Sequence, residues 1–218
     1  ATITSLASRS SSHAFTAASV TVRPSVRAPS GVTTWRTAIK DGAKMSKSKG
    51  NVVDPEAIFE KYGADTARLF MLFAAPPEKD LDWSDKGVEG SYRFLSRIWR
   101  FVDKHAASYK AGSTPSAELS PALKKVRGEL HRTVMIVTGD IREKNQYNTA
   151  IARMMELVNL LYGTDENEFA TADGSAVITE VFDKLIPMLN PFTPHIAEEM
   201  WEFIGNRELL VDKAWPSW

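Results

Sequence analysis

The sequence of 218 residues predicts a mainly α-helical protein. From residue 88 onward, apolar residues recur at every third or fourth position, which is the spacing of one helix face. Ser, Asn, Asp and Pro precede several of these runs, as they do where helices begin, and no alternating strand pattern of any length is present. We therefore expect a short loop and connector over 37–87, followed by an α-helical bundle over 88–218.

Residues 1–36 have a different composition from the rest of the chain. They are rich in Ser, Thr, Ala and Arg and contain no Asp or Glu, a composition that cannot form a packed core. We expect this segment to be disordered. It is either similar to a transit peptide or an artefactual segment, and the composition favours neither. We expect a cytoplasmic location, with a plastid or mitochondrion as the alternative if the segment is a transit peptide.

The connector carries clear helix boundaries. Asp54 followed by Pro55 is a typical N-cap and first helical residue, and Gly63 is a typical stop. A second short helix ends before Pro76 and Pro77, because the residue before a proline disfavours helical backbone. The expected elements are the end of a strand at 37–39, helices at 56–62 and 65–74, and a polar surface loop at 78–87.

Five amphipathic stripes predict the helices of the bundle. Ser120 with Pro121 begins the second helix, Asn148 is expected to cap the third, and Gly205 ends the last. The stripes run from Val88 to Val102, from Leu123 to Ile141, from Ile151 to Tyr162, from Val177 to Met188 and from Ile196 to Ile204.

Composition argues against several classes of function. The chain has no cysteine and its four histidines have no metal-ligand spacing, so no metal site is expected. No apolar run approaches the roughly 20 residues that span a bilayer, so no membrane partner is expected.

The net charge is zero, but its distribution is uneven. Residues 1–51 hold eight basic residues and one acidic residue, whereas the remaining 167 residues hold 19 basic and 26 acidic ones. Basic charge is therefore concentrated near the N-terminus.

The segment from Asp41 to Asn51 is the most informative stretch. It places three lysines among serines and glycines, and such a loop can close on an anion through ammonium, hydroxyl and backbone N–H donors. It does not have the spacing of the Gly-rich phosphate loop of nucleotide hydrolases. Taken alone, a run of Lys, Ser and Gly is more often a solvated surface loop.

Longer motifs favour the anion-binding interpretation. Lys44-Met45-Ser46-Lys47-Ser48 is similar to the signature (KMSKS) loop of class I aminoacyl-tRNA synthetases. The flanking residues resemble the subgroup that acts on leucine, isoleucine and valine. Five further stretches, at 63–77, 81–85, 87–90, 148–159 and 190–201, look like leucyl-tRNA synthetases of the bacterial type. The resemblance covers about residues 39–218.

The resemblance implies roles for the loop residues. In that family the loop closes over ATP, bound as its Mg²⁺ complex, and its lysines stabilise the charge that develops as pyrophosphate leaves. We expect Lys47, and then Lys44, to be catalytic. Met45, Ser46 and Ser48 complete the expected ATP-phosphate site, and Ser46, Ser48 and Asn51 are expected to shape or hinge the loop.

The family also requires parts that are not seen here. These are a nucleotide-binding half with a His-x-Gly-His motif and a leucine pocket, and none of the four histidines lies in such a motif. We expect this chain to be a C-terminal portion of a leucine–tRNA ligase. Leucine would bind only to the missing half, and this chain alone is expected to be inactive. The alternative is a non-catalytic helical module, derived from a class I synthetase, that binds tRNA or protein.

The bundle resembles the anticodon-binding domain of the family, which implies tRNA(Leu) as partner. One predicted helix gives this physical support, because its four cations are spaced 4, 3 and 4 residues apart and share a face. Such a row suits phosphates along a nucleic-acid backbone. The candidate tRNA-binding residues are Arg93, Arg97, Arg100 and Lys104. A solvated face with surface ion pairs such as Arg100–Asp103 is the alternative.

Other conspicuous residues favour structural roles. Trp83, Trp99 and Trp201 are expected to anchor packing, and His195 to be structural at a helix start. The acids at 198, 199 and 202 are expected to form a solvated helix face.

Overall fold

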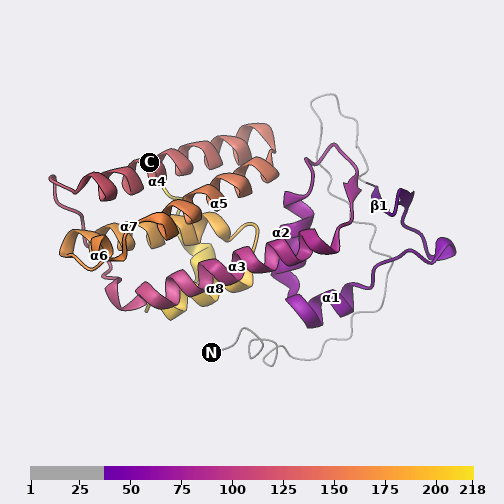
Figure 1. The fold of residues 1–218 in the computed structure, drawn as a ribbon, viewed down its shortest axis with the longest axis horizontal. Coiled ribbons are helices and arrows are strands. Elements are labelled where there is room, and N and C mark those ends of the chain that lie inside the picture. The colour runs from indigo at the N-terminus through magenta and orange to yellow at the C-terminus, as the bar shows by residue number, and fades with distance from the viewer. Residues whose placement is uncertain (1–36) are drawn as a thin grey trace. The chain divides into compact units, whose positions relative to one another are not determined.

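The computed structural model describes residues 37–218, so the segment predicted to be disordered, 1–36, lies outside the described residues. The chain divides into two compact units, with the boundary between Tyr92 and Arg93. Helix α3, Asp85–His105, crosses this boundary in the sequence. The mainly helical fold is confirmed (Figure 1).

The first unit contains a small three-stranded sheet in the order β2-β1-β3. Strand β1, Ala38–Lys40, pairs antiparallel with β2, Ala43–Lys44, and parallel with β3, Leu81–Asp82. The pairing of Lys40 with Ala43 leaves Asp41 and Gly42 as a two-residue hairpin turn. Both turn residues have positive φ, 54° and 73°, as the tight turns that match the twist of a hairpin require.

Strand β3 corrects one prediction. The segment 78–87 is not simply a polar surface loop, because Leu81 is buried and α3 already begins at Asp85. The Leu81 N–H donates to the Thr37 carbonyl at 2.9 Å, and the Trp83 N–H donates to the Ile39 carbonyl at 2.7 Å. These bonds attach the segment to the strand that enters the candidate loop.

Helices α1, Pro55–Tyr62, and α2, Ala64–Phe73, agree with the predicted connector. The Asp54 carboxylate accepts the Glu56 N–H, as expected of an N-cap. Trp83 packs edge-on against Phe70 at 5.1 Å between ring centroids, which confirms its packing role. The core of this unit is Phe70, Leu81 and Val88, flanked by Ile58, Tyr62, Met71 and Trp83.

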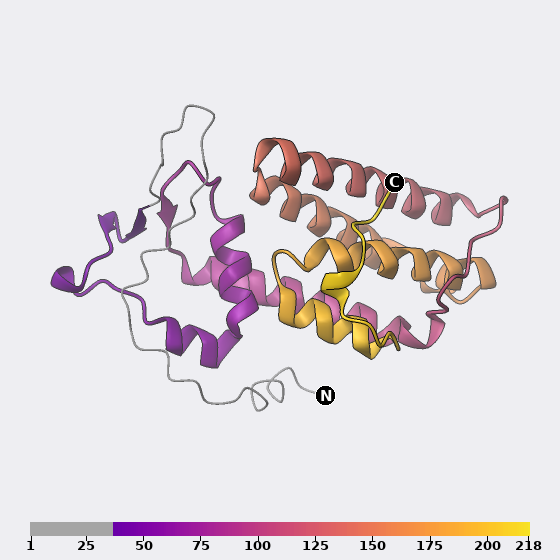
Figure 2. The same ribbon diagram turned by 180° about the vertical axis from the view of Figure 1, so that it is seen from behind.

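The second unit is a helical bundle (Figures 1 and 2). Helix α7 is its centre, because it packs on α4, α6 and α8 and buries most of its length, while α4 also packs on α5. The bounds are α4 Pro121–Gly139, α5 Tyr147–Gly163, α6 Glu166–Phe169, α7 Ala172–Leu189 and α8 Pro194–Phe203. Short turns occupy Ala106–Ser108, Asp140–Lys144 and Leu210–Asp212.

Several predicted details differ. Helix α5 begins at Tyr147, one residue before the expected cap Asn148, because the chain reverses at Asn145, whose φ is 54°. Ile141 lies in the π-turn that follows α4 rather than in α4 itself. The buried face of α3 is broader than the predicted stripe, since it also contains Phe94, Ile98 and Phe101.

The packing roles predicted for Trp99 and Trp201 are also confirmed. The ring centroids of Trp99 and Phe203 lie 5.4 Å apart, and Trp201 is 1 % exposed. Glu198 is not part of a solvated face: its carboxylate accepts the N–H groups of Leu210 and Val211, at 2.7 and 2.9 Å. This acid therefore attaches the C-terminal segment to α8.

Within residues 37–218, no helix combines the length and apolar character needed to cross a bilayer.

Candidate functional site

The candidate site is the loop that follows the β1–β2 hairpin in the first unit. The Met45 N–H donates to the Ala38 carbonyl at 2.8 Å and so continues the hairpin pairing into the loop. A 3₁₀ turn, Lys47–Lys49, comes next and ends at Gly50, which has a left-handed φ of 65°. The Gly50 N–H closes this turn on the Lys47 carbonyl at 3.2 Å. The signature residues, 44–48, therefore lie in the hairpin and in the turn that follows it.

The lysines of this loop point into solvent. Lys44, Lys47 and Lys49 are exposed, and within the part of the chain that the structure describes none of them forms an ion pair. Met45 and Ser46 are half-buried. The hydroxyls of Ser46 and Ser48 lie 3.2 Å apart, so they form one polar group beside the cations.

Asn51 connects the two ends of the loop. Its Oδ1 accepts the Ser46 N–H at 2.9 Å. Its Nδ2 donates to the carbonyls of Ala43 and Lys44, at 3.4 and 3.3 Å. One side chain thus contacts the backbone of β2 and of the residue that begins the turn.

The arrangement suits a polyphosphate. Three ammonium groups stand within six residues, and Asp41 is the one acid between positions 37 and 53. Because the described residues give these cations no carboxylate partner, their charge is available to an anion. Lysine ammonium groups act as mobile point charges, which fits an anion whose charge moves during a reaction.

The four predicted tRNA-binding cations all lie on α3, but they are not equivalent. Arg97 is held against α5: its guanidinium donates to Asn159 Oδ1 at 2.8 Å and lies 4.7 Å from the centroid of the Tyr162 ring. The Tyr162 hydroxyl donates in turn to the Arg97 carbonyl at 2.8 Å. Arg97 therefore links two helices of the bundle.

Lys104 also has an intramolecular partner, Glu166, with which it forms an ion pair. Arg93 and Arg100 are exposed, and the Nε of Arg100 donates to the Ser96 carbonyl at 3.2 Å. The pair Arg100–Asp103, which the alternative of a solvated face suggested, is not among the ion pairs of the described residues. The row is therefore continuous along the helix, but two of its members already hold neighbouring helices.

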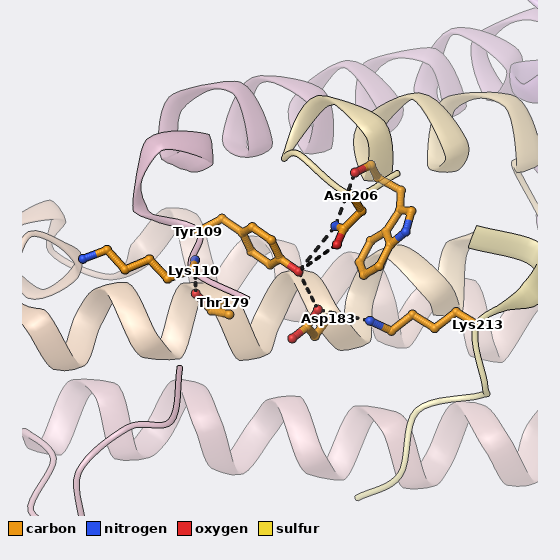
Figure 3. A network of polar contacts seen from close by, with 7 residues as sticks. Tyr109, Lys110, Thr179, Asp183, Asn206 and Lys213 are labelled. Atoms are coloured by element: carbon orange, nitrogen blue, oxygen red, sulfur yellow. Dashed lines mark hydrogen bonds and ion pairs between the residues drawn. The ribbon is translucent and has the colours of Figure 1, made fainter. Parts of the chain in front are cut away.

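A polar network in the second unit escaped sequence reasoning (Figure 3). The Tyr109 hydroxyl donates to Asp183 at 3.1 Å, and the Lys213 ammonium lies 3.3 Å from the same carboxylate. Burial raises the pKa of Tyr109, and Asp183 adds to this increase. Lys213 also lies 3.9 Å from the centroid of the Trp201 ring. These contacts fasten the segment after α3 and the C-terminal segment onto α7 and α8, so their role is structural.

Two surface hollows lie away from the predicted residues. One, of about 210 Å³, lies on the surface between α4 and α5. It is lined by Lys125, Arg132 and Arg153 together with Glu129 and Glu156. The other, of about 350 Å³, lies beside α4 near His131. Neither contains a residue of the loop or of the α3 row.

Comparison with protein families matches both units. Residues 33–84 match the family described as tRNA synthetases class I (I, L, M and V). Residues 124–218 match the anticodon-binding domain of tRNA ligase. The signature loop lies inside the first match, and helices α5 to α8 lie inside the second.

Curated relatives agree with these matches. The chain is 50 % identical to the leucine–tRNA ligase of Geobacter sp. (strain M21) over 193 residues, which cover 87 % of this chain and 23 % of the relative. It is also 50 % identical to the leucine–tRNA ligase of Citrifermentans bemidjiense over 190 residues, with the same two coverages. The chain thus spans about a quarter of the length of the curated relatives that it matches.

A solved structure shares the fold. It is the LeuRS of Agrobacterium radiobacter K84 in a ternary complex with tRNA and LeuAMS, with a TM-score of 0.69 and 28 % identity. The match covers 84 % of this chain and 23 % of that one. With relatives, family models and fold in agreement, this chain is homologous to part of the leucine–tRNA ligases, among the class I tRNA synthetases, and its residues 124–218 match their anticodon-binding domain.

Proposed function

We propose that the loop from Lys44 to Ser48 binds the phosphates of ATP while a leucine–tRNA ligase forms leucyl-adenylate. The observation that carries the proposal is the exposure of Lys44 and Lys47 on a hairpin-supported loop, without ion-pair partners among the described residues. The ATP is taken as its Mg²⁺ complex, so the metal arrives with the substrate.

The chemistry assigns the two lysines a role in the transition state. The leucine carboxylate attacks the α-phosphorus, the bond from that phosphorus to the bridging oxygen breaks, and pyrophosphate leaves with added negative charge. Ammonium groups that approach this charge stabilise the transition state more than they stabilise bound ATP. Lys47, in the 3₁₀ turn, is the first candidate, and Lys44, in β2, is the second.

Replacing Lys47 tests the proposal. In the complete ligase, Lys47→Ala is expected to lower leucine-dependent pyrophosphate exchange by at least about 100-fold, roughly 2.7 kcal/mol of barrier. Lys61→Ala is the matched control, because Lys61 is an exposed lysine of the same unit that lies over the Tyr62 ring. Exchange kinetics that stay at the wild-type level in Lys47→Ala would refute the assignment.

Adenylate formation by this chain alone is not expected. The chain has no His-x-Gly-His motif, which its family uses for nucleotide binding, so leucine and the adenosine must be held by other parts of the ligase. We expect the isolated chain to bind tRNA and to give no pyrophosphate exchange. If Lys47→Ala left the complete ligase fully active, the better interpretation would be that this chain contributes only tRNA or protein binding and takes no part in catalysis.

We further propose that the bundle binds tRNA(Leu) through phosphates that lie along α3. The match to an anticodon-binding domain supports this partner, and the related LeuRS is named in a complex with tRNA. The candidate contacts are the four cations of that helix, Arg93, Arg97, Arg100 and Lys104. Arg97 and Lys104 contribute to the same face while they hold α5 and α6.

A further inference from the structure

We propose that Asn51 is a positioning residue that fixes the conformation of the signature loop and so places Lys47 for the transition state. The inference rests on the function proposed for the loop. It adds a residue that does not touch ATP and acts through the backbone of its neighbours.

The geometry requires an amide at this position. Asn51 Oδ1 accepts one N–H, from Ser46, while Nδ2 donates to two carbonyls, of Ala43 and Lys44. A flipped amide would face its oxygen toward two carbonyl oxygens and its NH₂ toward an N–H, so this network defines the orientation. Asp would keep the acceptor but would place a carboxylate beside two carbonyls, and Ala would lose all three bonds.

Few other contacts hold this part of the loop. Strand β2 has two residues, and the 3₁₀ turn Lys47–Lys49 contains no buried residue. Gly42 and Gly50, which have positive φ, flank the lysines and allow the backbone many conformations when it is not bonded. Restricting each residue of such a segment costs conformational entropy. The three bonds of Asn51 help to offset this cost before any ligand arrives.

Ser46 is the residue through which Asn51 acts on Lys47. The Ser46 N–H is bonded to Asn51, and the Ser46 carbonyl accepts the Lys49 N–H at 3.1 Å, so Ser46 fixes the start of the turn that carries Lys47. When a group that stabilises developing charge is displaced slightly, it loses more stabilisation of the transition state than of the ground state. Loss of the Asn51 bonds should therefore lower kcat more than it raises KM for ATP.

The activity test uses the complete ligase and a double-mutant cycle. Asn51→Ala is expected to lower kcat of adenylate formation about 10-fold, with less than about a 3-fold change in KM for ATP. In a Lys47→Ala background the same substitution should cost less than about 3-fold, because the group that Asn51 positions is gone. Asn51→Asp should be as impaired as Asn51→Ala. Asn167→Ala, which removes an exposed amide bonded inside its own turn, is the matched control and should keep wild-type kinetics.

The outcomes separate this inference from the proposed function. Additive losses for Asn51→Ala and Lys47→Ala, or full activity of Asn51→Asp, would overturn the positioning role while leaving the role of Lys47 intact. Full activity of Lys47→Ala would instead overturn the proposed function of the loop.

A structural readout in the isolated chain needs no activity. Hydrogen exchange of the Ser46 amide, followed by NMR, should be at least about 10-fold faster in Asn51→Ala than in wild type. The Met45 amide, which bonds to Ala38 in the hairpin, should change less and serves as the internal reference. Equal Ser46 exchange in the two proteins would show that Asn51 does not hold the loop.

Discussion

His105, at the end of α3, is a histidine placed among aromatic rings. Its ring lies 4.5 Å from that of Phe101 and 5.4 Å from that of Phe169, measured between centroids, and the residue is 6 % exposed. Burial lowers the pKa of His105 below its usual 6.5, and the nearby Glu166 carboxylate opposes this effect only in part. The folded protein therefore favours the neutral imidazole.

This pKa predicts how stability depends on pH. Between the lowered folded pKa and 6.5 the unfolded chain binds a proton that the folded chain does not, so stability falls as the pH falls below 6.5. His105→Phe should remove this part of the pH dependence, since Phe keeps the aromatic packing and does not titrate. Thermal unfolding of the chain from pH 7.5 downward would measure the difference. His195→Phe, at an exposed histidine, should keep the slope that His105 provides, and an unchanged slope in His105→Phe would contradict the prediction.

Helix boundaries show which parts of the fold local sequence determines. The caps at Asp54 and Ser120 were predicted correctly because an N-cap bonds within its own first turn. Strand β3 was missed because two residues carry no periodicity, and its bonds are to residues about forty positions earlier. The expected cap Asn148 was wrong because the reversal at Asn145 determines where α5 begins.

The candidate site divides in the same way. The lysines of the loop were found from a contiguous motif, which needs no knowledge of the fold. The partners that hold Arg97 and Lys104 come from α5 and α6, more than sixty residues later, and no local pattern predicts them. Glu198 likewise looked solvated, because its backbone partners lie beyond the end of its own helix.

The junction between α6 and α7 depends on a glycine. A Cβ on Gly174 would lie 2.0 Å from the Glu168 carbonyl oxygen and 2.6 Å from the Phe169 Cα, both backbone atoms that cannot rotate away. We expect Gly174→Ala to destabilise the chain by about 1–3 kcal/mol or more. Gly128→Ala is the matched control, because nothing lies within 4 Å of its Cβ position in α4, and it should stabilise by up to about 1 kcal/mol. Urea denaturation of the two variants should give shifts of opposite sign, and a shift in the same direction would contradict the steric argument.

The charge of the whole molecule constrains how it can bind tRNA. The chain has zero net charge, and residues 93–218 hold 15 basic and 17 acidic residues. A bundle with this balance does not attract a polyanion through its net charge, so the attraction must come from local groups. Residues 93–105 include four Lys and Arg residues and one Asp, so the basic charge of α3 is concentrated in this part of the helix.

A matched pair of double variants tests whether binding is local. Arg93→Ala with Arg100→Ala removes two cations of the α3 face, and Arg142→Ala with Arg207→Ala removes two exposed cations elsewhere in the second unit. Net charge changes equally in both. Each lost phosphate contact reduces the slope of log K against log salt by about one, so the first variant should flatten the slope by about two. Titration of tRNA(Leu) at several salt concentrations would measure this. If both variants flattened the slope equally, the effect would be one of net charge, and the α3 face would lose its assignment. A change confined to the first variant would place the phosphates along α3, because both variants lose the same net charge and only the first loses it on α3.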